Sequence, residues 1–275
     1  MALSSVRVIP TIMKAKGWHK AATLLETWFS RARYIRANPV AGTSPPNNEL
    51  NSAFNANALG GLAWIKGTNV GRDAYDRIFS DMLWRSATDR NGNARRKLGR
   101  LLRSEGILNE RARNTRFGFR NYSAAEYERT RTAVNASTYS TGILNAFGID
   151  EMTAALGSFT LKFALNGTLT YEPPLSILGR NIGSGSYKVK PESIDIWLWD
   201  LFDFEGDQPL GHWRESPPEV GVFGFNGSVE VTNRSFRDWR NSPAANGMGG
   251  DFYIYTEPVR VRLENDSEFD ITPHL

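Results

Sequence analysis

The sequence predicts an α+β protein, with a helical N-terminal half followed by an antiparallel, β-rich C-terminal half. Two observations predict this class. Apolar residues before about residue 155 recur at intervals of three and four, whereas after Gly157 they alternate with polar residues. We therefore expect a mainly helical region over 1–155. A β-rich region over 156–275, shaped as an open barrel or curved sheet, would carry the catalytic site, either with its own core or sharing one with the helices.

The helical half opens with an amphipathic segment over 11–33, in which Trp18, Ala22, Leu25 and Phe29 form one stripe. Residues 36–57 mix Pro, Gly, Ser and Asn without an apolar period, so they predict a loop. Ser123 and Glu126 form a capping-box pattern, and Gly157 stops the last helix. Further helices are expected within 58–67, 73–88, 94–107, 123–137 and 148–157.

The β half begins at 158–171, where Phe159, Leu161, Phe163 and Leu165 alternate with polar neighbours. The Asn166-Gly167 pair that follows predicts a hairpin turn. Further strands are expected within 186–190, 193–200, 228–233, 251–256 and 259–263.

Composition narrows the function classes. The 275 residues carry a formal charge of +4 and contain no cysteine, which excludes disulfides, thiolate nucleophiles and zinc sites built on sulfur. The metalloprotease, P-loop and serine-hydrolase motifs are missing as well. No signal peptide is visible, so action outside the producing cell would require a carrier that does not read such a signal.

The stretch 85–120 is strongly basic, with eleven Lys and Arg residues against three acidic ones. Its aromatic residues, Phe117 and Phe119, lie at one end and are not interleaved along the stretch for base stacking. We therefore expect a solvated face or a membrane contact rather than a nucleic-acid interface. The amphipathic segment 94–104 is the part expected to rest on a membrane surface.

The stretch 200–214, DLFDFEGDQPLGHWR, concentrates the residues that could carry chemistry. On an unbroken strand Asp200 and Asp203 would point to opposite faces, so the strand must end or bulge near Phe202 if they cooperate. Gly206 and Gly211 then allow sharp turns that could return the chain toward the carboxylates.

This stretch offers a metal and phosphate site, and the alternative is an acidic connecting loop. Asp203 and Asp207 are the candidate Mg²⁺ ligands, and Asp200 is the carboxylate partner of Asp203. His212 is the candidate proton carrier and Arg214 the candidate pyrophosphate clamp.

The same stretch resembles the colicin M family of bacteriocins, whose Asp-x-Tyr-Asp signature is followed by His and Arg. The resemblance implies Mg²⁺-dependent cleavage of lipid II between undecaprenol and pyrophosphate. It matches Asp200 and Asp203 to the two aspartates, and His212 and Arg214 to the His-Arg pair. Two departures are visible: Phe202 replaces the tyrosine, and Trp213 separates the histidine from the arginine.

The segments 16–32, 203–213 and 233–256 are similar to an uncharacterised proteobacterial family associated with type VI secretion loci. That resemblance implies an antibacterial effector exported without a signal peptide. It also implies a cognate immunity protein and a component of the secretion apparatus as partners.

Arg237, Arg240 and Asp251 admit two interpretations. They are candidate substrate-binding residues, forming a phosphate-binding rim beside the stretch 200–214. Equally, they could form an arginine–carboxylate network that holds the β half together.

The leading hypothesis is an antibacterial enzyme that acts in the periplasm of the target cell, where it hydrolyses the undecaprenyl-pyrophosphate linkage of lipid II with Mg²⁺ as cofactor. The alternatives are a secretion-associated binding or adaptor protein without enzymatic activity, and a muramidase with two carboxylates across a groove. Convergence of Asp200, Asp203 and His212 in one open cleft would favour the enzyme.

Overall fold

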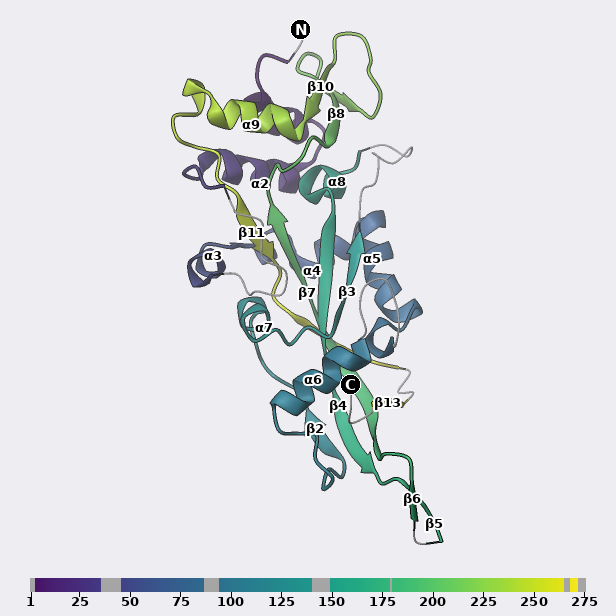
Figure 1. The fold of residues 1–275 in the computed structure, drawn as a ribbon. Coiled ribbons are helices and arrows are strands. Elements are labelled where there is room, and N and C mark those ends of the chain that lie inside the picture. Colours follow the sequence, from purple (N-terminus) through teal and green to yellow (C-terminus); the bar gives the residue numbers. More distant parts are fainter. Residues whose placement is uncertain are drawn as a thin grey trace. The chain divides into compact units, whose positions relative to one another are not determined.

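A computed structural model describes residues 3–35, 46–86, 94–139, 149–178, 180–264 and 268–271 (Figure 1). The chain forms two compact units, each assembled from three separate stretches. Unit 1 comprises Met1–Gly71, Tyr139–Phe159 and Asp200–Tyr255, and unit 2 comprises Arg72–Thr138, Thr160–Trp199 and Thr256–Leu275. Each unit therefore combines residues from both sides of residue 155.

The predicted α+β class is confirmed, with a curled antiparallel sheet built mainly from the C-terminal half. No helix in the described part of the chain is long and apolar enough to cross a membrane. The α-helices are α1 (Ile9–Ala15), α2 (His19–Ser30), α3 (Asn47–Asn51), α4 (Gly61–Lys66), α5 (Asn69–Ser80), α6 (Ala94–Ser104), α7 (Ala124–Thr130), α8 (Glu151–Leu156) and α9 (Asn233–Asn241).

The strands are β1 (Phe54–Asn55), β2 (Thr115–Phe117), β3 (Asn135–Tyr139), β4 (Phe159–Glu172), β5 (Leu175–Ile177), β6 (Arg180–Ile182), β7 (Ser186–Phe202), β8 (Pro209–Arg214), β9 (Glu219–Gly221), β10 (Val229–Thr232), β11 (Phe252–Tyr255), β12 (Val259–Arg262) and β13 (Phe269–Ile271).

Unit 2 is organised around the antiparallel pair β4–β7, which extends from Leu161 opposite Leu198 to Glu172 opposite Ser186 with one shift of register between Asn166 and Gly167. Strands β2 and β3 pair with β4, and β12 and β13 pair with β7. Residues Phe163–Gly167 and Ile194–Trp199 are buried without alternation, so both faces of the sheet are covered at its middle.

A buried carboxylate ties three parts of unit 2 together. Asp195 on β7 is 2% exposed and accepts hydrogen bonds from the hydroxyl of Tyr127 (2.5 Å) and the amide of Asn166 (3.2 Å). The guanidinium of Arg260 on β12 donates two more, at 2.7 and 3.0 Å. Burial and the nearby carboxylate of Asp195 raise the pKa of Tyr127, which therefore keeps its proton as a donor.

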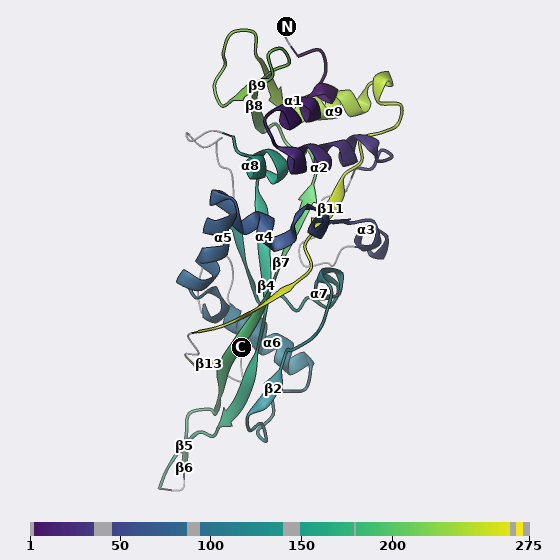
Figure 2. The same cartoon turned by 180° about the vertical axis from the view of Figure 1, so that it is seen from behind.

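Unit 1 packs helices around an aromatic cluster. Helices α1, α2, α8 and α9 lie together with the three-stranded sheet β10–β8–β9 (Figures 1 and 2). Phe204 stacks on Phe236 with ring centroids 4.0 Å apart, and Trp28 meets Phe204 edge-on at 4.9 Å. Trp28 is fully buried, so α2 is fixed against the residues that follow β7.

Three predictions about local structure are wrong. Asn166-Gly167 makes no turn, because β4 runs unbroken through it and only the register with β7 shifts there. The predicted loop 36–57 contains helix α3 and strand β1, while residues 36–45 lie outside the described residues. Helix α9 interrupts the predicted β half, because Phe236 and Arg240 are buried at helical spacing.

Several local predictions are confirmed. The capping box joins Ser123 and Glu126 at the start of α7, and α8 ends before Gly157. Strand β7 ends at Phe202, as cooperation between Asp200 and Asp203 would require. Gly206 has a φ angle of 71° and lies in the predicted turn, whereas Gly211, with φ 99°, lies within strand β8 and makes no turn.

Asp195→Ala is expected to lower the free energy of unfolding by about 3 kcal/mol, because it leaves the buried donors of Tyr127 and Asn166, and the more exposed guanidinium of Arg260, without this acceptor. Urea denaturation measures this change. The matched control is Asp270→Ala on β13, an exposed aspartate of the same unit, which should change stability by less than about 0.5 kcal/mol. Equal effects of the two variants would contradict the role assigned to Asp195.

Candidate functional site

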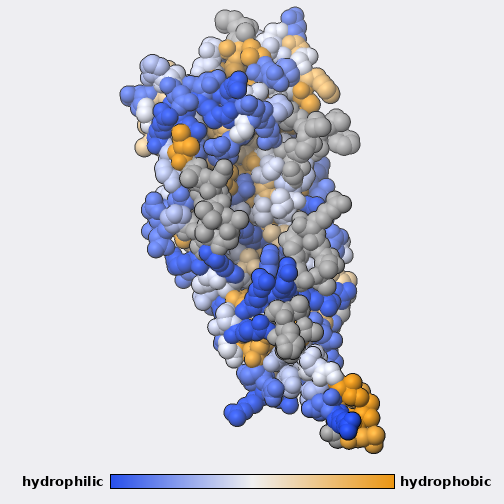
Figure 3. All heavy atoms as spheres, in the orientation of Figure 1, coloured by the Kyte–Doolittle hydropathy of each residue, from blue (hydrophilic) through white to orange (hydrophobic). Residues whose placement is uncertain are grey.

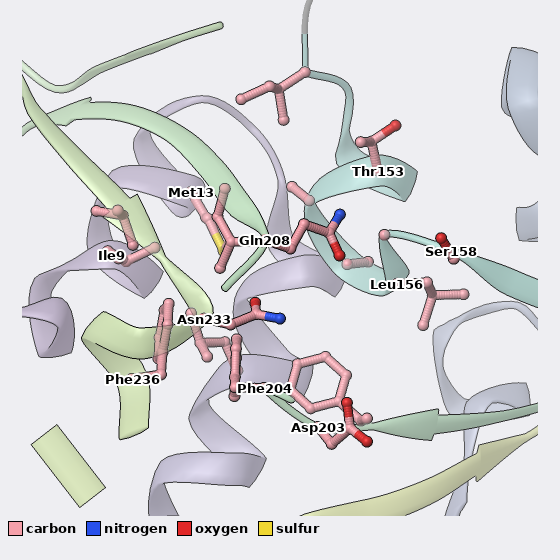
Figure 4. A pocket seen from close by; sticks show the side chains of 18 of the residues that line it. Ile9, Met13, Thr153, Leu156, Ser158, Asp203, Phe204, Gln208, Asn233 and Phe236 are labelled. Carbon is pink, nitrogen blue, oxygen red and sulfur yellow. The ribbon is translucent and has the colours of Figure 1, made fainter. Parts of the chain in front are cut away.

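Unit 1 contains a cavity of about 300 Å³ whose wall is mostly apolar (Figure 4). The size and lining are those of a site that takes a small molecule or part of a chain-like one. Its apolar wall comes from α1, α2, α8, the end of β7, β8, β10, α9 and the segments next to them, through Ile9, Met13, Leu25, Ile149, Ala154, Ala155, Leu156, Leu201, Phe202, Phe204, Leu210, Trp213, Val231 and Phe236.

Local structure explains how these residues reach one cavity. Ile9 and Met13 lie four residues apart on α1 and share a face of that helix. Helix α8 starts at the N-cap Asp150, whose carboxylate accepts from the backbone N–H of Thr153 at 2.7 Å. The end of β7 at Phe202 lets the following residues leave the sheet and line the cavity.

Asp203 is the ionisable group that distinguishes this cavity. Among the residues that the structure describes, the one hydrogen bond to its carboxylate comes from the N–H of Glu205 and is long, at 3.5 Å. Burial, with smaller contributions from the carboxylates of Asp251 and Glu205, raises the pKa of Asp203 to about 6. A carboxyl group with that pKa changes its charge near neutral pH.

The other polar groups of the wall are neutral side chains and one further carboxylate. They belong to Thr153, Ser158, Gln208, Asn233 and Glu205. The Asn233 amide donates to the carbonyl of Glu205 at 2.5 Å and so holds the segment after Asp203. No lysine, arginine or histidine is among the described residues that line the cavity.

Of the four predicted catalytic residues, only Asp203 lines this cavity. Asp200 lies near the end of β7. His212 lies on β8 opposite Gly221 and Glu230, within the three-stranded sheet. Asp200, Asp203 and His212 are therefore not brought together in the cavity.

The predicted clamp residue Arg214 supports the loop between β9 and β10. Its guanidinium pairs with Glu219 and donates to the carbonyl oxygens of Asn226, at 2.8 Å, and Pro217, at 3.3 Å. The guanidinium also lies 5.1 Å from the ring centroid of Phe225. These contacts of Arg214 stabilise the local fold around the loop.

Arg237 fixes the turn that follows Asp203. It donates to the carbonyl oxygens of Phe204, at 2.7 Å, and Gly206, and it pairs with Asp207 at 2.6 Å. Arg234 pairs with the same carboxylate at 3.5 Å. Arg237 is thus a positioning residue for the segment that carries Asp203.

Arg240 and Asp251 form a buried ion pair at 2.8 Å, with both side chains 1–2% exposed. Asp251 also accepts from the indole N–H of Trp28 at 3.0 Å, and Arg240 lies over the same indole ring. The pair joins α9 to α2 and to the start of β11. This arrangement corresponds to the second interpretation of these residues, an arginine–carboxylate network that holds the structure together, and not to a substrate-binding rim.

The predicted Mg²⁺ ligands do not form a donor set. The carboxylate of Asp207 is engaged by two arginines, whereas Asp203 lines the cavity. Within the described ranges, no group of three or more His, Asp or Glu side chains is placed to hold a metal ion. The described carboxylates therefore do not fit Mg²⁺ here.

The site defines an α+β protein with a mostly apolar cavity that is lined by two carboxyl groups, those of Asp203 and Glu205. The family model described as "Family of unknown function (DUF6402)" matches residues 5–222 and 218–271. The chain belongs to this family. Neither the curated proteins nor the solved structures yielded a match.

Asp203→Asn should stabilise the protein at neutral pH. The raised pKa means that the folded protein keeps a proton which the unfolded chain loses between about pH 4 and pH 6. Stability therefore falls as the pH rises through that window, and the asparagine variant escapes this loss. We expect its advantage over the wild type to be about 2 kcal/mol larger at pH 7.5 than at pH 4.

Denaturation with urea at both pH values measures this difference. Asp238→Asn, at an exposed position on α9, is the matched control and should track the wild type. A variant at Asp203 that is no more stable than the wild type at pH 7.5 would refute the assigned pKa.

Proposed function

We propose that unit 1 binds a largely apolar molecule in this cavity and that Asp203 receives its polar end. The observation that carries the proposal is the apolar wall of a 300 Å³ cavity around one half-buried carboxyl group. The function is thus closest to the binding-protein alternative derived from the sequence.

The chemistry of the wall restricts the ligand. Asp203 has one long hydrogen bond, so its carboxylate keeps lone pairs that a ligand donor can use. Two carboxylates and no cation line the cavity in the described residues, so an anionic group would be repelled there. We therefore assign a neutral or cationic ligand with an N–H or O–H donor beside an apolar body.

Binding of N-phenyl-1-naphthylamine, an uncharged apolar probe with one N–H group, tests this function. The wild type should bind it with a rise in probe fluorescence. Ala154→Trp, which places a large ring on the cavity wall, should weaken binding at least tenfold because the ring occupies the ligand's space.

Ala125→Trp is the matched control, since Ala125 also lies half-exposed on a short helix but belongs to unit 2. It should bind the probe like the wild type. Thr153→Trp is a second variant of the wall in case Ala154→Trp fails to fold. Unchanged affinity in a folded wall variant would refute the proposed cavity function.

The raised pKa of Asp203 favours a second candidate, a hydrolase in which Asp203 transfers the proton. A carboxyl group with a pKa near 6 in an apolar setting suits general acid–base work. Glu205 lines the same cavity, and two carboxyl groups in different environments are the arrangement that glycosidases use. This supports the muramidase alternative.

Cleavage of lipid II in the periplasm of a target cell stays a prediction that follows from the resemblance to colicin M. Delivery by type VI secretion and a cognate immunity protein stay predictions as well. Toxicity that appears only when the protein is exported to the periplasm of an expressing cell would support that setting.

The second candidate predicts that purified protein releases product from peptidoglycan or from lipid II. Chromatography distinguishes the two reactions, because glycan cleavage yields new reducing ends and lipid II cleavage yields a soluble pyrophosphorylated muropeptide. Asp203→Asn should lower the rate at least 100-fold, as expected for loss of a general acid, while Asp238→Asn keeps it. Release of neither product by the wild type would reject the hydrolase and leave the binding function standing.

A further inference from the structure

The hairpin formed by β5 and β6 in unit 2 exposes an apolar surface. We define the hairpin surface as Leu175, Ile177, Leu178, Arg180 and Ile182. Its four apolar side chains are 64%, 47%, 99% and 54% exposed, in chain order. Figure 3 shows this apolar patch over β5 and β6. Four large exposed apolar side chains within eight residues are unusual in a folded protein.

Strand register places these side chains on one face. Leu175 lies opposite Ile182, and Ile177 lies opposite Arg180. Ser176 and Asn181 form the intervening pair and therefore point to the other face. The hairpin is thus amphipathic, and the exposures show that no described element of unit 2 is packed on its apolar face.

The backbone conformation and the exposure of Leu178 indicate that the hairpin surface binds a partner. Its backbone has φ +50°, a left-handed conformation that costs a leucine about 1 kcal/mol. Its side chain is almost fully exposed, so packing within unit 2 does not offset this cost. A strained, exposed leucine at the end of a hairpin is therefore explained by a partner outside the chain.

Charge points to an anionic partner. Arg180 is the one charged residue of the segment 175–182, whereas Lys188 on the adjoining strand β7 is paired with Glu172 at 2.8 Å. Arg180 is exposed, and no ion pair or hydrogen bond of its side chain is found among the described residues. Its guanidinium is available for phosphate groups.

The small size of the hairpin surface favours a membrane over a protein as its partner. A stable protein interface uses roughly 20 to 30 residues on each side, far more than this hairpin offers. The two strands have three residues each, which corresponds to roughly 10 Å. That length matches the depth of about 5 to 10 Å at which amphipathic elements lie in the interfacial layer of a bilayer.

We propose that the hairpin surface inserts into the interfacial layer of a bilayer that contains anionic lipid. The apolar side chains contact the acyl chains, and Arg180 binds the lipid phosphates. Helix α6, which the sequence suggested for this role, buries Leu98 and Leu102 in unit 2, so those side chains are committed to the core. We therefore assign the membrane contact to the hairpin surface and not to helix α6.

Cosedimentation with vesicles tests the proposal. The wild type should bind vesicles of phosphatidylcholine with one quarter phosphatidylglycerol more strongly than vesicles of phosphatidylcholine alone. Leu178→Asp should lower the bound fraction at least tenfold. Arg180→Glu should weaken binding to the anionic vesicles about fivefold or more and abolish the preference for them. Val259→Asp, at a 44% exposed position on β12 of the same unit, is the matched control and should bind like the wild type.

A second measurement reports insertion directly. The chain has no cysteine, so Leu178→Cys allows a single environment-sensitive dye to be attached at the hairpin. Dye fluorescence should rise and shift to shorter wavelength on addition of anionic vesicles, whereas dye at Val259→Cys should not respond.

Two results would overturn the proposal. One is equal vesicle binding by the wild type, Leu178→Asp and Val259→Asp, or no binding by any of them. The other is a concentration-dependent dimer in sedimentation equilibrium that Leu178→Asp abolishes, because the hairpin surface would then contact a second copy of the chain. The cavity that carries the proposed function lies in unit 1, so probe binding there does not depend on either result.

Discussion

The antiparallel pairing of β4 with β7 is the constraint on which unit 2 depends. Strands β2, β3, β12 and β13 each pair with one of these two strands, so an error in their register would displace the whole sheet. The register of the pair shifts once, between Asn166 and Gly167, and such a bulge locally bends a strand. The same ladder supports the β5–β6 hairpin, which would be marginally stable as an isolated two-stranded element.

Alternation and helical spacing predicted the class and most elements, because both report which side chains are buried. They failed where a tertiary contact decides the conformation. Gly167 is needed because a side chain there would approach the carbonyl of Lys190 to 2.2 Å, and the amide of Asn166 bonds Ser193 and Asp195. The sequence pair typical of a turn thus serves close packing inside a strand, which a local pattern cannot distinguish.

The candidate site was predictable only in part. The density of carboxylates after β7 identified Asp203, but the cavity wall comes from α1, α8 and α9, which are far apart in the sequence. Local spacing also cannot tell which carboxylates have arginine partners. Asp207 and Asp251 do, whereas burial raises the pKa of Asp203 and the long hydrogen bond from Glu205 offsets only part of that rise.

The buried contact between Trp28 and Asp251 has a consequence for the order of synthesis. The two residues are 223 positions apart, and Trp28 is fully buried in unit 1. At typical ribosomal rates, roughly 10 to 50 s separate their translation. During that interval the apolar face of α2 has no native partner from α9 or β11, so the nascent chain depends on shielding from aggregation until the codons for α9 and β11 are read.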